Sequence, residues 1–206
     1  MFNLIRKKLN RRNLKDDNYA FLFDDYKGKE CVVFDTETTG LNTKKDEILS
    51  IGAVTIKDNK ILSSQTFEVF LKPSNTISEK SITIHNIRPC DLDNALEPHK
   101  AIHDFLHYIG SKPLVGYYLE FDIKMINRYI KPWLGIVLPN KATEVSAIYF
   151  DKKISLIPQG NIDLGFDTIM RDLNIPNMGK HNAVNDAIMT AMMYLKLQRW
   201  VPDRRY

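Results

Sequence analysis

The feature that most constrains this chain is a short apolar segment that ends in two carboxylates. The segment Cys31–Asp35 has the composition of a buried strand, and Glu37 follows Asp35 by two positions. Side chains alternate along a strand, so residues two apart point to the same face. Burying two like charges costs several kcal/mol unless a cation or a hydrogen-bond donor neutralises them. The pattern therefore predicts a metal ion at the end of this strand.

The length and composition of the chain suit one domain with its own hydrophobic core. Its 206 residues are 44% apolar, so neither disulfides nor a structural metal is needed to hold that core. The two cysteines, Cys31 and Cys90, are too few for a disulfide framework and lack the spacing of a Cys/His metal site. The apolar runs fall far short of the ~20 residues that cross a bilayer, so no transmembrane segment is expected. We therefore expect a cytoplasmic protein with reduced thiols.

Hydrophobic periodicity predicts an α/β fold with a mixed five-stranded sheet flanked by helices. Strands are expected to be antiparallel at first and parallel later, at 31–35, 48–57, 61–71 and 114–118, with a fifth apolar segment at 145–150. Asp58-Asn59 is a hairpin signal between the second and third strands. Helices are expected at 97–109, 121–130, 166–173 and 184–198, with a short helix or turn at 78–88. Pro132 is expected to end the second of these helices.

The basic charge of the chain is concentrated in its first fifteen residues. They hold six of the 29 basic residues and none of the 25 acidic ones, which leaves 23 basic and 25 acidic residues, a net charge of −2, on the remainder. We expect a basic, helical N-terminal arm over 1–28, a domain over 29–200 and a short C-terminal tail over 201–206. The arm is interpreted as a solvated helix packed on the domain, as a contact for nucleic-acid phosphates, or as a contact for an anionic membrane.

Two further carboxylates lie where they could complete the predicted metal site. Asp122 follows the predicted strand 114–118, and Asp186 lies in the first turn of the last helix, where a carboxylate also favours the helix dipole. Singly, each is more typical of an ordinary helix start. Together with Asp35 and Glu37 they form a set of hard oxygen ligands without cysteine or clustered histidine. Such a set favours Mg²⁺ or Mn²⁺ over Zn²⁺.

His181 lies five residues before Asp186. On one continuous helix that spacing would turn the two side chains about 140° apart. We therefore place His181 in a loop, with Gly179 before it and Asn182 after it as the N-cap of the last helix. Beside a metal cluster an imidazole can accept a proton from an activated water, which makes His181 the candidate general base.

These five residues and their surroundings resemble the DEDDh group of DnaQ-like exonucleases, the family of the epsilon proofreading subunit of bacterial DNA polymerase III. The resemblance covers about residues 31–198. The family's Asp-x-Glu-Thr-Thr-Gly motif is matched at 35–40, and the strand associated with it at 47–54. Its Ile-His-Gly-Ile motif is matched at 84–87, with asparagine in place of glycine, and its His-x4-Asp motif at 181–186.

The second motif departs from the family pattern. The family has Gly-His-Asn before its Phe-Asp, whereas this chain has Gly116-Tyr117-Tyr118 before Phe121 and Asp122. The ligand Asp122 is retained, and the family's asparagine, which contacts substrate or orients the site, is replaced. A tyrosine here could donate one hydrogen bond or stack on a base, or simply pack in the core.

The resemblance implies an RNase H-like fold and the release of nucleoside monophosphates from the 3′ ends of single-stranded or frayed DNA. It implies a catalytic set of five residues. Four of them hold two divalent ions, Mg²⁺ or Mn²⁺, about 4 Å apart: Asp35, Glu37, Asp122 and Asp186. The fifth, His181, acts as the base. The resemblance also implies that Leu41, Phe121 and His85 flank the terminal nucleotides, with the backbone of Thr38 near the 3′ end. Tyr117 is a further candidate for substrate binding, from the chemistry of its side chain.

Several alternatives for substrate and partner stay open at this stage. RNA 3′-end trimming is one alternative, because the motifs do not report on the 2′-hydroxyl. A non-catalytic nucleic-acid-binding or scaffold subunit is another. Association with a DNA polymerase, in proofreading or repair, would fit the family. Because the body is slightly acidic, attraction for phosphates is expected from the arm and from local residues such as Lys124 and Lys180.

Overall fold

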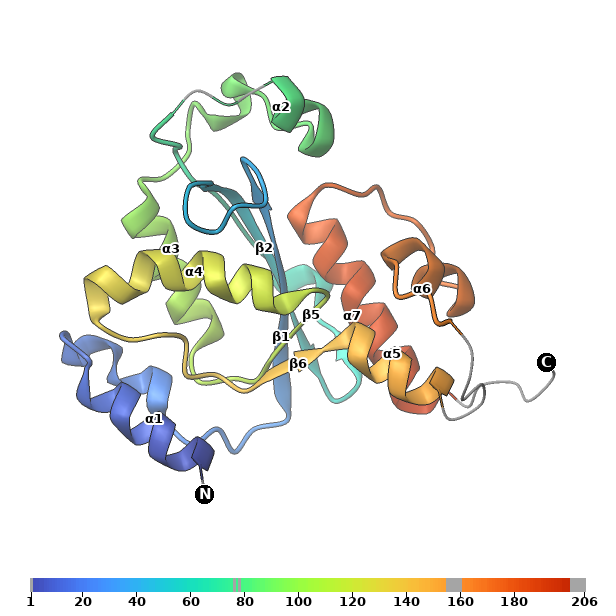
Figure 1. Cartoon of the computed structure of the whole chain (residues 1–206), viewed down its shortest axis with the longest axis horizontal. Coiled ribbons are helices and arrows are strands. Elements are labelled where there is room, and N and C mark those ends of the chain that lie inside the picture. Colours follow the sequence, from blue (N-terminus) through green and yellow to red (C-terminus); the bar gives the residue numbers. More distant parts are fainter. Residues whose placement is uncertain (1, 76, 78, 155–160, 201–206) are drawn as a thin grey trace.

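The computed structural model describes residues 2–75, 77, 79–154 and 161–200 (Figure 1). A mixed sheet runs through the centre of the molecule in the order β3-β2-β1-β5-β6, and β4 also pairs with β2. Its strands are β1 (Glu30–Thr38), β2 (Ile48–Lys57), β3 (Lys60–Ile61), β4 (Phe67–Phe70), β5 (Leu114–Gly116) and β6 (Ala142–Glu144). Strands β1 to β4 pair antiparallel, whereas β5 and β6 join in parallel.

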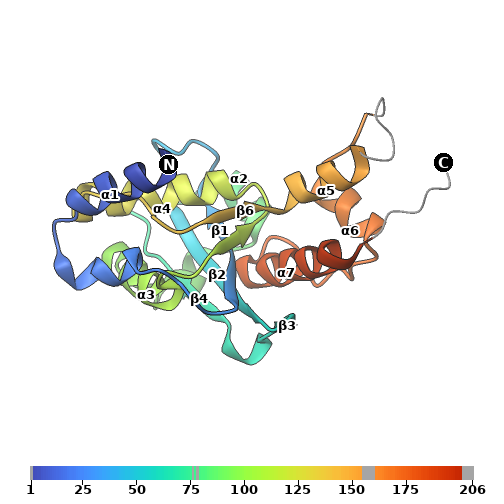
Figure 2. The same ribbon diagram turned by 90° about the horizontal axis from the view of Figure 1, so that it is seen from below.

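Helices cover both faces of the sheet (Figures 1 and 2). Their bounds are α1 (Phe2–Arg12), α2 (Glu79–His85), α3 (Pro98–Ile109), α4 (Leu119–Leu134), α5 (Val145–Ile154), α6 (Phe166–Asp172) and α7 (Ala183–Arg199), with short 3-10 turns η1 (Asp17–Phe23), η2 (Ser63–Gln65) and η3 (Pro89–Leu92). One core cluster lies between the sheet and helices α3 and α4, and a second lies between the sheet and α5, α6 and α7. Of the helices described, none combines the length and apolar content that a bilayer crossing requires.

The hairpin between β2 and β3 forms as predicted, but the third strand is interrupted. Asp58 and Asn59 both adopt a left-handed backbone, with φ of 48° and 60°, as a two-residue hairpin turn requires. Strand β1 pairs along all of β2, so β3 and β4 share the other edge of β2. The expected strand 61–71 is thus split in two by the turn η2, and its two pieces, β3 and β4, together form one edge of the sheet.

Two other predictions are wrong in detail. The apolar segment at 145–150 is helical and belongs to α5, while the strand at the sheet edge is the less apolar β6 just before it. Helix α4 also continues past Pro132 to Leu134. Lys15 explains this extra turn, because its backbone N–H donates to the Leu134 carbonyl at 3.0 Å and its Nζ to the Pro132 carbonyl at 3.0 Å. These donors satisfy carbonyls that the last turn leaves without partners.

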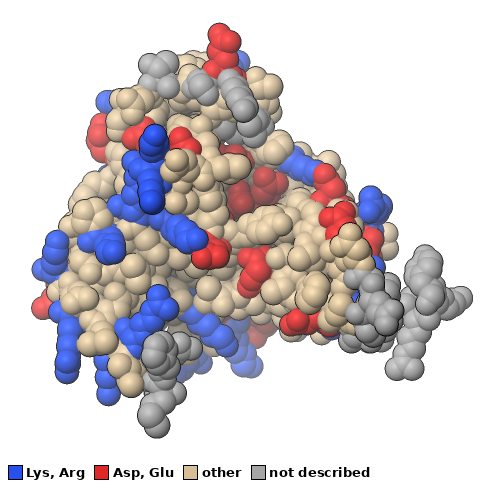
Figure 3. All heavy atoms as spheres, in the orientation of Figure 1, with Lys and Arg blue, Asp and Glu red and all other residues tan. Residues whose placement is uncertain are grey.

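The N-terminal arm is docked on the domain. The side-chain amide of Asn10 in α1 donates to the Val137 carbonyl at 2.8 Å and accepts from the Val137 N–H at 3.1 Å. Tyr19 and Leu22 of η1 are buried in the core beside α3 and α4. On the face drawn in Figure 3, Lys and Arg side chains gather around α1, and acidic side chains lie in a hollow nearer the centre. The tail at 201–206 lies outside the described residues.

Candidate active site

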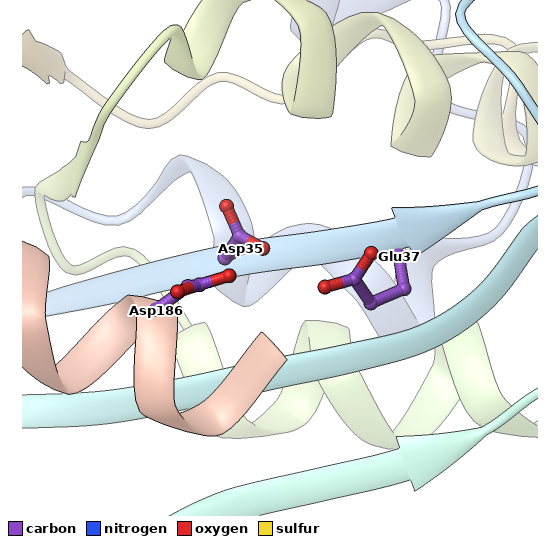
Figure 4. Close-up of side chains that lie close together, drawn as sticks. All are labelled: Asp35, Glu37 and Asp186. Carbon is purple, nitrogen blue, oxygen red and sulfur yellow. The ribbon is translucent and has the colours of Figure 1, made fainter. Parts of the chain in front are cut away.

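Three carboxylates converge at the end of β1. Asp35 and Glu37 project from one face of β1, as the two-residue spacing predicts, and Asp186 reaches them from the first turn of α7 (Figure 4). One oxygen from each can be chosen so that all three lie within 4.8 Å of one another. The residues thus come from segments some 150 positions apart in the chain and meet where the start of α7 lies beside β1 (Figure 4).

A glycine in β2 lets α7 approach the sheet this closely. Gly52 pairs with Asp35 across the β1/β2 ladder. A Cβ at this position would lie 2.2 Å from the carbonyl carbon of Ala183 and from the backbone nitrogen of Val184, a distance at which the helix would have to move. Asn182 caps the same helix end by accepting a hydrogen bond from Asn185 N at 3.0 Å, which confirms the predicted N-cap. The start of α7, and with it Asp186, is therefore set directly on the strand.

Asp122 lies close to the three carboxylates but is bound differently. Strand β5 pairs with β1 only through Val32 and Val33, so the edge of β1 beyond them faces α4 instead of a strand. There the Thr36 N–H donates to Asp122 Oδ1 at 3.1 Å, and the Thr36 hydroxyl donates to the same oxygen at 2.6 Å. Asp122 is buried, and with Asp35 it lines a cavity of about 1090 Å³.

Burial raises the pKa of all four carboxyl groups, and repulsion from neighbouring carboxylates within the set adds to the shift of Asp35 and Glu37. Burial, followed by repulsion from Asp186 and Asp122, raises the pKa of Glu37 to about 8. Burial also raises the pKa of Asp122 to about 7, although the hydrogen bonds from Thr36 oppose the shift. The pKa of Asp35 is raised well above its usual value by burial and by the three other carboxylates. Burial raises the pKa of Asp186 too, against the opposing hydrogen bond from the His181 backbone.

These residues fit a divalent cation. Asp186 Oδ1 is buried and has no hydrogen-bond partner among the described residues. An orphaned buried carboxylate oxygen is costly, and the neighbouring groups here are acceptors that repel it. A cation placed among the carboxylates would provide the missing partner and lower the raised pKa values. The oxygen-only donor set matches Mg²⁺ or Mn²⁺.

His181 lies in a loop beside the carboxylates, as predicted. Its backbone is left-handed, with φ of 61°, and follows Gly179 at φ of 90°. Its N–H donates to Asp186 Oδ2 at 3.0 Å, so the loop and the carboxylate are joined through the main chain. The imidazole is exposed and lines a small cavity of about 300 Å³ together with Ser50 and Asn86. The imidazole is therefore accessible from solvent, in a cavity whose lining includes none of the four carboxylates.

The residues expected to contact substrate are placed in different ways. Leu41, Phe121 and Tyr117 line the same cavity as Asp35 and Asp122, and Leu41 is 86% exposed, which is unusual for an apolar side chain. The Tyr117 hydroxyl donates to the Leu164 carbonyl at 2.8 Å, so it is already engaged within the protein.

Thr38 lies outside this cavity lining. The Thr38 hydroxyl donates to the Gly40 carbonyl at 2.8 Å, which helps to form the turn after β1. His85 is the last residue of α2, and its side chain is outside the described part of the structure. Both expected phosphate contacts near the site have acidic partners: Lys124 pairs with Glu120 at 2.8 Å, and Lys180 pairs with Asp167.

Two positioning residues were missed by the sequence reasoning. Thr36 holds Asp122 as described, and its place between Asp35 and Glu37 on the opposite face of the strand could have indicated it. Glu144 of β6 accepts hydrogen bonds from Tyr118 N at 3.1 Å and Leu119 N at 2.8 Å, which fixes the start of α4. Nothing in the local sequence of Glu144 signals this contact, because it depends on how β6 aligns with β5.

Comparisons with known proteins agree with this geometry. Residues 32–194 match the profile of the exonuclease family RNase T. The chain is 29% identical over 185 residues to a PolC-type DNA polymerase III of Thermotoga petrophila, which covers 90% of this chain and 12% of that protein. It is 26% identical over 166 residues to the epsilon subunit of DNA polymerase III of Aquifex aeolicus, covering 81% and 79%. The chain thus spans about an eighth of its PolC-type relatives and most of the epsilon subunit.

A solved structure confirms the expected fold. Exonuclease I of E. coli in complex with a dA16 oligonucleotide superposes with a TM-score of 0.67 at 16% identity, over 83% of this chain and 41% of that one. This likeness shows a shared RNase H-like architecture, and the family match covers the segments that carry Asp35, Glu37, Asp122 and Asp186. The chain therefore belongs to the RNase T family of exonucleases, the DnaQ-like group that its motifs resemble.

Proposed function

We propose that this chain is a metal-dependent 3′→5′ exonuclease that releases nucleoside monophosphates from single-stranded or frayed DNA ends. The observation that carries the proposal is the convergence of carboxylate oxygens from β1 and α7 within 4.8 Å, at a site where Asp186 Oδ1 is buried and has no hydrogen-bond partner in the described part of the chain. Family membership supports an exonuclease. The relatives named as DNA polymerase III PolC-type and epsilon support DNA as substrate and a role beside a polymerase.

In this proposal the carboxylates hold two divalent ions, Mg²⁺ or Mn²⁺. Asp35, Glu37 and Asp186 form the cluster, and Asp122 completes the set from α4. When bound, such ions activate water and stabilise negative charge on the phosphoryl oxygens. Thr36 keeps Asp122 oriented, so the protein presents its ligands without having to rearrange.

His181 is proposed to accept the proton of the attacking water. Its exposed side chain can receive a proton and pass it to solvent, and its main-chain bond to Asp186 keeps it beside the reacting phosphate. Leu41 and Phe121 are proposed to support the terminal base, since both line the cavity that contains Asp35. Tyr117 contributes the edge of its ring, because its hydroxyl is bound to Leu164.

The proposal is tested by following purified protein with oligonucleotides labelled at the 5′ end. Single-stranded DNA should shorten as a ladder in Mg²⁺ or Mn²⁺ and stay intact with chelator. Asp35→Asn should abolish shortening, whereas Asp151→Asn, an exposed acid on α5, should leave it unchanged. Matched RNA oligomers separate the ribonuclease alternative. Internal cleavage, release from the 5′ end, or full activity of the Asp35 variant would refute the assignment.

A further inference from the structure

We propose that the DNA strand whose 3′ end occupies the active site continues into a second, neighbouring cavity, where the N-terminal helix α1 contacts its phosphates. This inference rests on the proposed function and adds the path of the substrate. One wall of the second cavity is formed by residues that precede the range matched by the exonuclease family, which begins at 32, and the opposite wall lies within that range.

The two cavities adjoin each other. The active-site cavity contains Asp35 and Asp122, and the second, of about 1040 Å³, is lined by α1, by the segment before β6 and by residues ahead of β1. Ile123 and Ala142 line both cavities. A polymer that leaves the carboxylates past these two residues would therefore reach the second cavity next.

The charge of the second cavity is opposite to that of the first. Arg6, Lys7 and Lys141 line it, against one acidic residue, Asp24. Lys7 pairs with Asp25 at 3.2 Å, whereas Arg6 and Lys141 are exposed and have no carboxylate partner among the described residues. Figure 3 shows the corresponding separation, with basic side chains around α1 and acidic ones in the hollow. The phosphates of a nucleic acid would thus meet basic side chains in the second cavity, beyond the acidic site, and two of these, Arg6 and Lys141, are available to pair with them.

The wall of this cavity is formed in advance. Asn10 links α1 to Val137 by two hydrogen bonds, and the Asn140 side-chain amide donates to the Gly110 and Lys112 carbonyls at 2.8 Å each. Both asparagines line the cavity. The helix and the segment leading to β6 are therefore fixed to each other, and little ordering would be needed on binding. Tyr26 also lines the cavity and offers a ring on which a base can stack.

The test compares two double variants of the full-length protein. Arg6→Gln with Lys141→Gln removes the two unpaired cations, and Lys60→Gln with Arg199→Gln removes two exposed cations from elsewhere on the surface. Affinity for a long single-stranded DNA, protected by a terminal phosphorothioate, is measured over a range of salt concentrations. Loss of two phosphate contacts should make the slope of log K against log salt less steep by about 1.4 for the first double variant. The second should keep the wild-type slope.

The kinetics of hydrolysis show which part of the DNA strand the two cations contact. The Arg6/Lys141 variant should raise KM for long DNA with kcat unchanged, because its contacts lie away from the reacting bond. Its kinetics on a dinucleotide, too short to reach the second cavity, should equal those of the wild type. A photoreactive base placed upstream of the 3′ end should also cross-link to Tyr26.

The outcomes separate this inference from the proposed function. If the wild type cleaves DNA but both double variants share its salt slope, the path is wrong and the exonuclease assignment stands. If the wild type does not cleave any DNA in Mg²⁺ or Mn²⁺, the proposed function fails, and the salt slopes alone then report whether this surface binds a single strand. Equal KM effects on dinucleotide and long DNA would also overturn the path.

Discussion

Replacing Glu37 by glutamine should stabilise the metal-free protein at alkaline pH. The Glu37 carboxyl is buried against Asp186 and Asp122, and its pKa is about 8 against an ordinary 4.5. Between those two pH values the folded protein binds a proton that the unfolded chain has released, so folding stability falls as pH rises. The difference of 3.5 pH units, at about 1.4 kcal/mol each, corresponds to about 5 kcal/mol. Glutamine cannot ionise, so the variant does not lose this part of its folding stability as the pH rises.

The assay is urea unfolding at a series of pH values, followed by the fluorescence of Trp133 and Trp200. With chelator, the unfolding free energy of the wild type should fall between about pH 5 and about pH 9, and Glu37→Gln should remove the part of that fall that is due to Glu37. At the alkaline end Mn²⁺ should restore stability to the wild type and do much less for the variant. Glu68→Gln, an exposed glutamate on β4 opposite Gly52, is the matched control and should behave as wild type.

The reasoning is refuted if Glu37→Gln is no more stable than the wild type at alkaline pH in chelator. It is also refuted if the wild type shows no fall in stability over the same range. Either result would mean that the carboxyl is solvated, or that the chain relaxes to separate the charges. Strong Mn²⁺ stabilisation of the glutamine variant would instead place the ion away from Glu37.

Three further substitutions test single contacts. His181→Asn should lower kcat by about 10²- to 10⁴-fold while leaving Mn²⁺ affinity unchanged, because asparagine tolerates the left-handed backbone and the bond to Asp186 comes from the main chain; a loss of metal binding in calorimetry would contradict this. Thr36→Val should destabilise the metal-bound protein by about 1–3 kcal/mol, since Asp122 loses a 2.6 Å donor; unchanged urea midpoints in Mn²⁺ would count against it. Gly52→Ala should cost about 1–3 kcal/mol and weaken Mn²⁺ binding, because the new methyl would meet the backbone of α7; wild-type affinity would show that the helix start does not set the site.

Much of the site could be predicted because it depends on local geometry. The alternation of side chains along β1 places Asp35 and Glu37 together, and the rotation per residue of a helix requires His181 to precede α7. Both arguments use only spacing within one element. They were sufficient to predict two of the three carboxylates that the structure brings together, Asp35 and Glu37, as well as the loop position of the histidine.

The remaining features depend on contacts between elements. Helix α4 passes Pro132 because Lys15, more than a hundred residues earlier, supplies donors to its last carbonyls. The orientation of Asp122 follows from the short pairing of β5 with β1, and Glu144 reaches the start of α4 across β6. Hydrophobic periodicity also could not distinguish strand from helix at 145–150, because a short apolar run suits either.

The docking of α1 and η1 decides which experiments on the N-terminal arm can be interpreted. A chain begun at Glu30 would lose Tyr19 and Leu22 from the core and leave the end of α4 without the donors of Lys15. Such a deletion would damage folding and nucleic-acid affinity together, and neither effect could be assigned. An affinity tag or fusion partner joined ahead of α1 keeps every one of these contacts, so engineering at this end should add to the chain and never shorten it.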